Sequence, residues 1–178
     1  VDKEQAARQA EYRSLWRKFV FAAIISVPVI LVSYPGFFPV LKDLPMETMR
    51  LLWGLTALLT LPVLFYSAGH FFSGAWSAFK HRAADMNTLI ALGTGAAWLY
   101  SLAAVILPQI FPAGTSEPFF DVVSVVTALV VLGQVLELRA RSQTSNAIKA
   151  LLGLAPKTAR LIREDGTEED VPLESVKQ

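Results

Sequence analysis

The chain has 178 residues, of which 53% are hydrophobic and 17% charged, whereas about 25% of the residues in an ordinary soluble domain are charged. The charges gather at both ends and in short connectors around long apolar runs, which excludes a soluble globular domain and indicates several membrane spans. The lack of cysteine excludes a disulfide framework and a thiolate metal site in this chain, and nothing in the sequence suggests nucleic-acid binding.

The first part of the chain is expected to enter the membrane twice. Residues 1–18 are polar and charged and should form a cytoplasmic lead-in helix. The first span is expected at residues 19–34, where Pro28 is tolerated because neighbouring helices can satisfy the carbonyl it frees. A connector rich in proline follows. The second span is expected at residues 49–68, with Pro62 as a kink site.

Residues 69–82 are expected to form an amphipathic helix on the membrane surface. One side of this segment carries apolar residues at helical spacing, namely Phe72, Ala75, Trp76 and Phe79. The other side carries hydroxyl and basic residues, namely Ser73, Ser77, Lys80 and Arg82. The bend that turns the spanning helix into the surface helix is predicted at Ser67, Ala68 and Gly69.

Two more spans follow in the sequence. The third is expected at residues 86–107, where Gly93 and Ala97 form a small-xxx-small pair that permits close approach of another helix. The fourth is expected at residues 119–138. Its helical pattern continues over residues 139–152, which should project into the cytoplasm.

Residues 153–178 are expected to begin a β-rich cytoplasmic domain. They carry strand patterns at residues 158–163 and 168–173 on either side of a turn at Asp165 and Gly166. Because the chain starts without methionine and ends inside this domain, we expect it to be a piece of a longer protein. The predicted fold is thus an all-α membrane protein with four transmembrane helices and an interfacial helix, followed by the start of a β-rich domain.

The distribution of basic residues predicts the orientation in the lipid bilayer. Lysine and arginine flank the start of the first span, the connector between the second and third spans, and the end of the fourth span. The two other connectors carry only Lys42 and the interfacial Arg50. By the positive-inside rule, both ends are expected in the cytoplasm.

Three runs of the sequence resemble the heavy-metal (P1B-type) P-type ATPases, and most of all their copper(I)-exporting subfamily. The runs are HFFSGAWSAFKH, DMNTLIALGTGAAWLYS and VVLGQVLELRARSQTSNAIKALLGLAPKTARLI. The resemblance covers the chain from about residue 12 to residue 178. It implies two helices that precede the six-helix transport core, the first two core helices, and the start of the actuator domain.

The same resemblance implies what the chain does not carry. The actuator TGE loop, the CPC metal motif, the DKTGT phosphorylation motif and amino-terminal CxxC domains do not occur in it. ATP and Mg²⁺ are therefore expected to bind in the remainder of the ATPase chain, and this piece is not expected to be catalytically competent alone. The transported ion is expected to be Cu(I).

Met86 and Glu137 are the candidate metal ligands on the cytoplasmic side. The third span leaves the cytoplasm at Met86, and the fourth returns to it at Glu137. A thioether is a soft ligand that suits Cu(I), and a carboxylate near the hydrocarbon edge needs a reason to be there. The resemblance implies that this pair receives copper as it enters. The alternatives are a core-filling methionine and a glutamate that pairs with Arg139 or Arg141.

Two further sites are implied by the resemblance. Asp121, at the outer end of the fourth span, would be an exit ligand, although the family more often has glutamate there; the alternative is a solvated aspartate that caps the helix. Lys80, His81 and Arg82 would form a platform for a cytosolic copper chaperone or the protein's own amino-terminal metal-binding domain. The alternative for these three is ordinary positive-inside anchoring.

The leading functional hypothesis is the membrane part of an ATP-driven copper(I) efflux pump of a bacterial inner membrane. A zinc, cadmium or other heavy-metal pump of the same architecture is one alternative, which the proline-containing outer loop and Met86 disfavour. A free-standing four-span protein that binds metal or acts as a scaffold is the other. A projecting helix followed by an unfinished hairpin argues against that last possibility.

Overall fold

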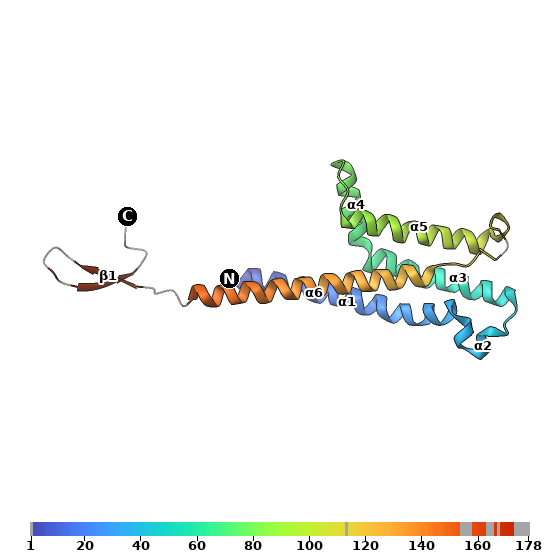
Figure 1. Ribbon diagram of the computed structural model, residues 1–178, viewed down its shortest axis with the longest axis horizontal. Coiled ribbons are helices and arrows are strands. Elements are labelled where there is room, and N and C mark those ends of the chain that lie inside the picture. The colour runs from blue at the N-terminus through green and yellow to red at the C-terminus, as the bar shows by residue number, and fades with distance from the viewer. Residues whose placement is uncertain (1, 113, 154–157, 163–165, 167, 173–178) are drawn as a thin grey trace. The chain divides into compact units, whose positions relative to one another are not determined.

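The computed structural model describes residues 2–112, 114–153, 158–162, 166 and 168–172 (Figure 1). Within these residues, four helices are long and apolar enough to cross a membrane, namely Gln5–Ser33, Met46–Ser67, Met86–Ile106 and Phe120–Ser145. This agrees with the four predicted spans. The chain divides into two compact units, Val1–Glu137 and Leu138–Gln178, which are described separately.

Helix α1 (Asp2–Ser33) opens the first unit as a single element. The predicted lead-in and the first span are therefore continuous, and Pro28 lies inside the helix without ending it. The connector that follows contains a 3₁₀ turn, η1 (Pro35–Phe37), and one short helix, α2 (Pro39–Lys42). Proline begins both of these elements, as its fixed φ angle favours.

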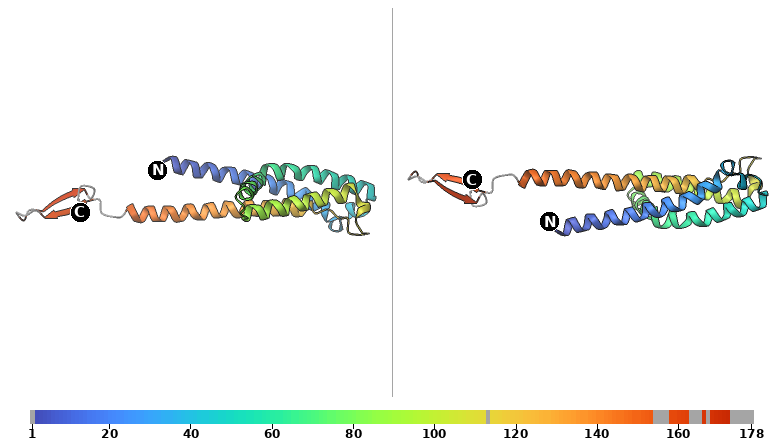
Figure 2. Two further views of the ribbon diagram at one scale, coloured as in Figure 1. Left: turned by 90° about the horizontal axis from the view of Figure 1, so that it is seen from above. Right: turned by 90° about the horizontal axis from the view of Figure 1, so that it is seen from below.

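The second span changes its helical form before it reaches the surface helix. Helix α3 (Met46–Pro62) passes into a π-helical segment, η2 (Val63–Ser67), whose last hydrogen bond joins Ala68 N to Val63 O at 2.9 Å. Helix α4 (Gly69–Lys80) then runs across the direction of the spanning helices (Figure 1), and the view from above looks along it (Figure 2). The chain therefore turns at the end of the π-helical segment.

Helices α5 (Met86–Ile106) and α6 (Phe120–Gly153) run antiparallel (Figure 1). Their connector contains a 3₁₀ turn, η3 (Pro108–Ile110). The start of α6 is attached to α5 by a hydrogen bond from Phe119 N to Ser101 Oγ, 2.7 Å long. This bond fixes how far the two helices are shifted relative to each other along their axes, with Phe119 beside Ser101.

The core of the first unit is apolar and small. One cluster joins η2, α4, α5 and α6; its buried members are Leu64, Ala68, Phe71, Ile90, Ala91, Val123 and Val131. The buried hydroxyl groups mostly bond to a carbonyl of the preceding turn, as Ser26, Thr60, Thr94 and Thr127 do. Only 17% to 39% of each spanning window is buried, so most apolar surface faces outward. Such surface is suited to lipid and to further helices.

The second unit contains the end of α6 and a hairpin. Strands β1 (Thr158–Ile162) and β2 (Glu168–Pro172) pair antiparallel, with Thr158 opposite Pro172 and Ile162 opposite Glu168. Two exposed ion pairs at 3.2 Å join Arg160 to residues of β2. Gly166, between the strands, has a positive φ of 79°.

The hairpin agrees closely with the strand patterns in the sequence. Asp165, which was predicted in the turn, lies outside the described residues, as do the last six residues of the chain. That the hairpin begins a β-rich actuator domain stays a prediction.

Candidate metal-uptake site

Met86 is the first residue of α5, and its side chain is 56% exposed. The residue before it, Asp85, caps the helix: Asp85 Oδ1 accepts a hydrogen bond from Thr88 N at 2.9 Å, and Thr88 Oγ1 lies 3.4 Å from Asp85 N. The bond from the Thr88 backbone is the main cause that lowers the pKa of Asp85. A fixed negative charge therefore lies one residue before the exposed thioether.

Sequence reasoning missed this role of Asp85. The spacing of aspartate and threonine three residues apart, directly before an apolar run, is the signal that could have revealed it. Asn87 adds a second local bond, from its Nδ2 to Asp85 Oδ2 at 2.9 Å. The carboxylate is thus ordered by its own helix start.

Glu137 lies on α6 at the same end of the helix pair as Met86. The bond between Phe119 and Ser101 gives the common reference level. By helix rise, Met86 lies roughly 22 Å and Glu137 roughly 27 Å from that level, in the same direction because the helices are antiparallel. Glu137 is exposed and has an interaction partner of its own.

Two candidate ligands at the same end of a helix pair do not by themselves make a chelating site. Among the described residues, no group of three or more histidine, cysteine or carboxylate side chains could hold a metal ion.

Asp121 lies at the opposite end of α6, in the first turn. The residue is only 8% exposed, which argues against the alternative of a solvated cap. Its neighbour Phe120 packs with Val29 of α1 and Ala57 of α3. The negative charge of Asp121 is the main cause that raises the pKa of Tyr34, and a hydrogen bond between the two side chains adds to this effect. The Tyr34 hydroxyl therefore stays protonated and can donate to the carboxylate.

The predicted bend residues occupy the junction between η2 and α4. Ser67 Oγ donates to Lys18 O at 2.8 Å and so fixes the junction to α1. A Cβ added at Gly69 would meet nothing within 4 Å, so space alone does not require glycine there. Two hydrogen bonds therefore stabilise the bend, namely that of the Ser67 hydroxyl and the π-helical bond from Ala68 N to Val63 O.

His70 forms a contact that the sequence did not predict. Its Nε2 lies 2.8 Å from Gln134 Oε1 of α6, whereas its Nδ1 is buried without a hydrogen-bond partner. Burial is the main cause that lowers the pKa of His70. No local pattern could have found Gln134, which lies 64 positions away.

The predicted platform residues Lys80, His81 and Arg82 end α4 and are all exposed. Gly93 and Ala97 line an apolar groove of about 390 Å³ between α5 and α6; the other lining residues are Leu89, Ile90, Thr94, Val122, Val123 and Val126. A Cβ at Gly93 would meet nothing within 4 Å. The small-residue face is therefore open among the described residues.

No family model matches the chain, but its sequence is similar to several P-type ATPases. It is 42% identical to the silver-exporting P-type ATPase of Salmonella typhimurium over 173 residues, which are 93% of this chain and 21% of that protein. It is 40% identical to the copper-exporting P-type ATPase of Legionella pneumophila over 172 residues, again 93% of this chain and 23% of the relative.

A third relative is the copper-transporting P-type ATPase of Rhizobium leguminosarum, 48% identical over 125 residues, or 67% of this chain and 15% of that protein. The chain thus spans about a fifth of the length of the curated relatives it matches. Similarity at this level over nearly the whole chain, together with four helices fit to cross a membrane, shows that the chain belongs to the heavy-metal P-type ATPases.

Proposed function

We propose that the chain is the membrane part of an ATP-driven copper(I) efflux pump, and that Met86 and Glu137 receive the ion on the cytoplasmic side. The observation that carries the proposal is that these two residues lie at the same end of two antiparallel helices, about 5 Å apart along the helix direction. A thioether suits a soft monovalent cation, and the carboxylate supplies a negative charge that attracts it. Relatives named for copper or silver export support the same choice of ion.

The charge of Asp85 fits this role. It lies next to the exposed Met86 and is held ionised by the helix start. A negative charge at the mouth of the pathway raises the local concentration of a cation without becoming one of its ligands. Release on the other side would use Asp121, whose carboxylate is oriented by Tyr34. ATP and Mg²⁺ would bind in parts of the pump outside this chain.

Docking of a copper donor is the second part of the proposal. The exposed basic end of α4, Lys80, His81 and Arg82, would attract an acidic cytosolic chaperone or an amino-terminal metal-binding domain. In this arrangement both chain ends lie in the cytoplasm and the pump lies in a bacterial inner membrane. The basic flanks of the spans support that orientation.

The substitution Glu137→Gln in the complete pump tests the uptake site. It keeps the shape of the side chain but removes its charge, so the apparent copper affinity of ATP hydrolysis should fall by about tenfold or more. Copper-stimulated phosphate release in proteoliposomes measures this. Glu117→Gln, in the exposed outer connector, is the matched control and should leave the affinity unchanged. Unchanged affinity in Glu137→Gln would sink the proposal.

The same assay separates the competing metals. Stimulation by Cu(I) and Ag(I), but not by Zn²⁺ or Cd²⁺, is expected if the thioether of Met86 selects a soft monovalent ion. Met86→Leu should weaken the response to both monovalent ions. Stimulation by Zn²⁺ that is insensitive to Met86→Leu would favour the divalent-metal alternative.

A further inference from the structure

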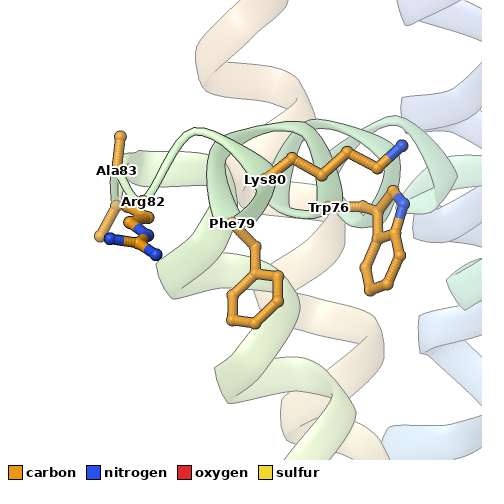
Figure 3. A pocket seen from close by; sticks show the side chains of 6 residues that line it. Trp76, Phe79, Lys80, Arg82 and Ala83 are labelled. Atoms are coloured by element: carbon orange, nitrogen blue, oxygen red, sulfur yellow. The ribbon is translucent and has the colours of Figure 1, made fainter.

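The end of α4 carries an open cavity of about 630 Å³ that the metal pathway does not use (Figure 3). Its lining combines two aromatic rings, two cationic side chains and two small residues, namely Trp76, Phe79, Lys80, Arg82, Ala83 and Ala84. None of the described residues that line it is acidic. The cavity therefore suits a ligand with an anionic group and an apolar part.

The two aromatic rings face one side of α4. Trp76 is 62% exposed and Phe79 72% exposed, and their ring centroids lie 6.0 Å apart in a stacked arrangement. Figure 3 shows both side chains directed to the side along which α5 runs. Exposed aromatic side chains at the end of a membrane span lie at the level of the lipid headgroups. An amphipathic helix in this position buries such residues at the boundary between headgroups and acyl chains.

The cationic side chains flank these rings. Lys80 Nζ lies 5.7 Å from the centroid of Trp76, a cation–π contact that keeps the ammonium group beside the cavity. The guanidinium group of Arg82 lies near Phe79 at the other end of the cavity (Figure 3). Both cations are thus available at the edge of an aromatic surface, where a headgroup phosphate would sit.

Arg82 occupies an unusual backbone conformation. Hydrogen bonds from Ala83 N to Ala78 O, 2.9 Å, and from Arg82 N to Phe79 O, 3.0 Å, close a Schellman motif in which Arg82 is the left-handed residue. Its φ is 52°, and glycine is the residue that ordinarily adopts this conformation without a steric cost. If the arginine served only to interact favourably with the helix dipole, it could stand one residue earlier, where the backbone would not have to adopt a left-handed conformation. An arginine kept in a costly conformation indicates a use for its side chain.

We propose that this cavity binds the headgroup of an anionic phospholipid of the cytoplasmic leaflet. Arg82 would contact the phosphate, Lys80 would add a positive charge at the opposite end of the cavity, and the rings of Phe79 and Trp76 would lie against the upper acyl chains. A guanidinium group binds phosphate through two parallel hydrogen bonds, and the cytoplasmic leaflet is the anionic one. A protein partner would approach α4 from the water, whereas the lipid approaches from the side to which the two rings point.

The test uses the full chain in nanodiscs of phosphatidylcholine that contain brominated phosphatidylglycerol or, separately, brominated phosphatidylcholine. Bromine quenches nearby indole fluorescence, and the signal of Trp76 is the difference between the unsubstituted chain and Trp76→Phe. We expect phosphatidylglycerol to be preferred at Trp76 by roughly fivefold or more, the factor typical of one basic side chain at an anionic surface. Arg82→Gly should reduce the preference by about that factor, and Lys80→Gln should reduce it as well.

Arg82→Gly is informative because glycine suits the left-handed position, so its melting temperature should stay equal or rise while lipid preference falls. Lys42→Gln removes one positive charge from α2, in the first connector, and should keep the preference. Equal quenching by the two lipids, or full preference in Arg82→Gly, overturns the proposal. So does a result in which Arg82→Gly keeps the lipid preference and loses only salt-sensitive binding of an acidic copper-carrier protein.

Discussion

Gly74 lies where α4 contacts the first turn of α5. A Cβ at this position would meet three atoms of Asn87: Nδ2 at 2.9 Å, Cγ at 3.0 Å and Cβ at 3.1 Å. Asn87 cannot simply turn away, because its amide is bonded to the capping carboxylate of Asp85. The absence of a side chain at Gly74 therefore allows the surface helix to lie close to the start of the third span.

Gly74→Ala is expected to destabilise the chain by about 1–3 kcal/mol, since Asn87 or the whole of α4 must move. Gly54→Ala is the matched control, because a Cβ there would meet nothing within 4 Å. In α3 the control should be neutral or gain up to about 1 kcal/mol from helix propensity. Thermal unfolding in detergent measures both, and equal effects of the two substitutions would contradict the close contact.

His70 links α4 to α6 in its uncharged form. Gln134, Lys18 and Ser67 are the groups that influence it, and burial, the largest effect, lowers its pKa below the ordinary value of about 6.5. As the pH falls through that ordinary value, the unfolded chain takes up a proton before the folded chain does. The stability contributed by neutral His70 is therefore complete above about pH 6.5 and is lost as the pH falls toward the lowered folded-state pKa.

The melting temperature of the chain should accordingly fall between pH 7.5 and pH 5.5, and it should fall less in His70→Gln, which cannot titrate. Carboxylates such as Asp85 are common to both chains, so their contribution cancels when the two changes of melting temperature with pH are compared. Parallel slopes would show that His70 is not the group responsible.

At the scale of elements, α3 and α5 are joined by two polar bonds at different levels. Arg50 Nη2 donates to Val105 O at 3.1 Å, and so satisfies one of the carbonyls that the end of α5 leaves without an intrahelical partner. Trp98 Nε1 donates to Thr60 Oγ1 at 3.1 Å. The interfacial arginine predicted from the sequence thus caps a neighbouring helix.

Trp98→Phe removes the second bond while it keeps an aromatic ring. We expect a loss of about 0.5–1.5 kcal/mol, the net value of an ordinary hydrogen bond. Trp76→Phe, in which the replaced ring is largely exposed, should cost less. A smaller loss in Trp98→Phe than in Trp76→Phe would mean that the bond to Thr60 contributes nothing to the helix pair.

At the scale of the whole molecule, the lack of cysteine in this chain makes its predicted orientation easy to test when the chain is expressed alone. Thr115→Cys places one thiol in the exposed connector between α5 and α6, and Gln143→Cys places one on the exposed surface of α6. In intact cells, a membrane-impermeant maleimide should label Thr115→Cys alone, because the proposed orientation places the other thiol in the cytoplasm. Gln143→Cys should react only after permeabilisation. The reverse pattern would invert the topology and with it the direction of the metal pathway.

The sequence predicted the parts of this molecule that depend on local patterns. Hydropathy gave the four spans, and the run around Met86 together with that around Glu137 gave the family and its two candidate ligands. The contacts of Gly74 with Asn87 and of His70 with Gln134 depend on how helices pack, which periodicity does not determine. The left-handed Arg82 was unpredictable for another reason, since glycine is the residue that such a position would suggest.

The π-helical segment η2 accommodates one residue more than a regular α-helix would hold over the same stretch. Deletion of one residue within Val63–Ser67 would therefore let α3 continue as a regular α-helix and leave the phase of the following residues nearly unchanged. Each residue of a regular α-helix advances the chain by about 100°, so an additional residue without the wider turn would rotate the chain that follows by that angle. Phe71 would then leave the buried cluster that it shares with α5 and α6. The wider turn thus absorbs the additional residue and preserves which side chains of α4 face the helix core.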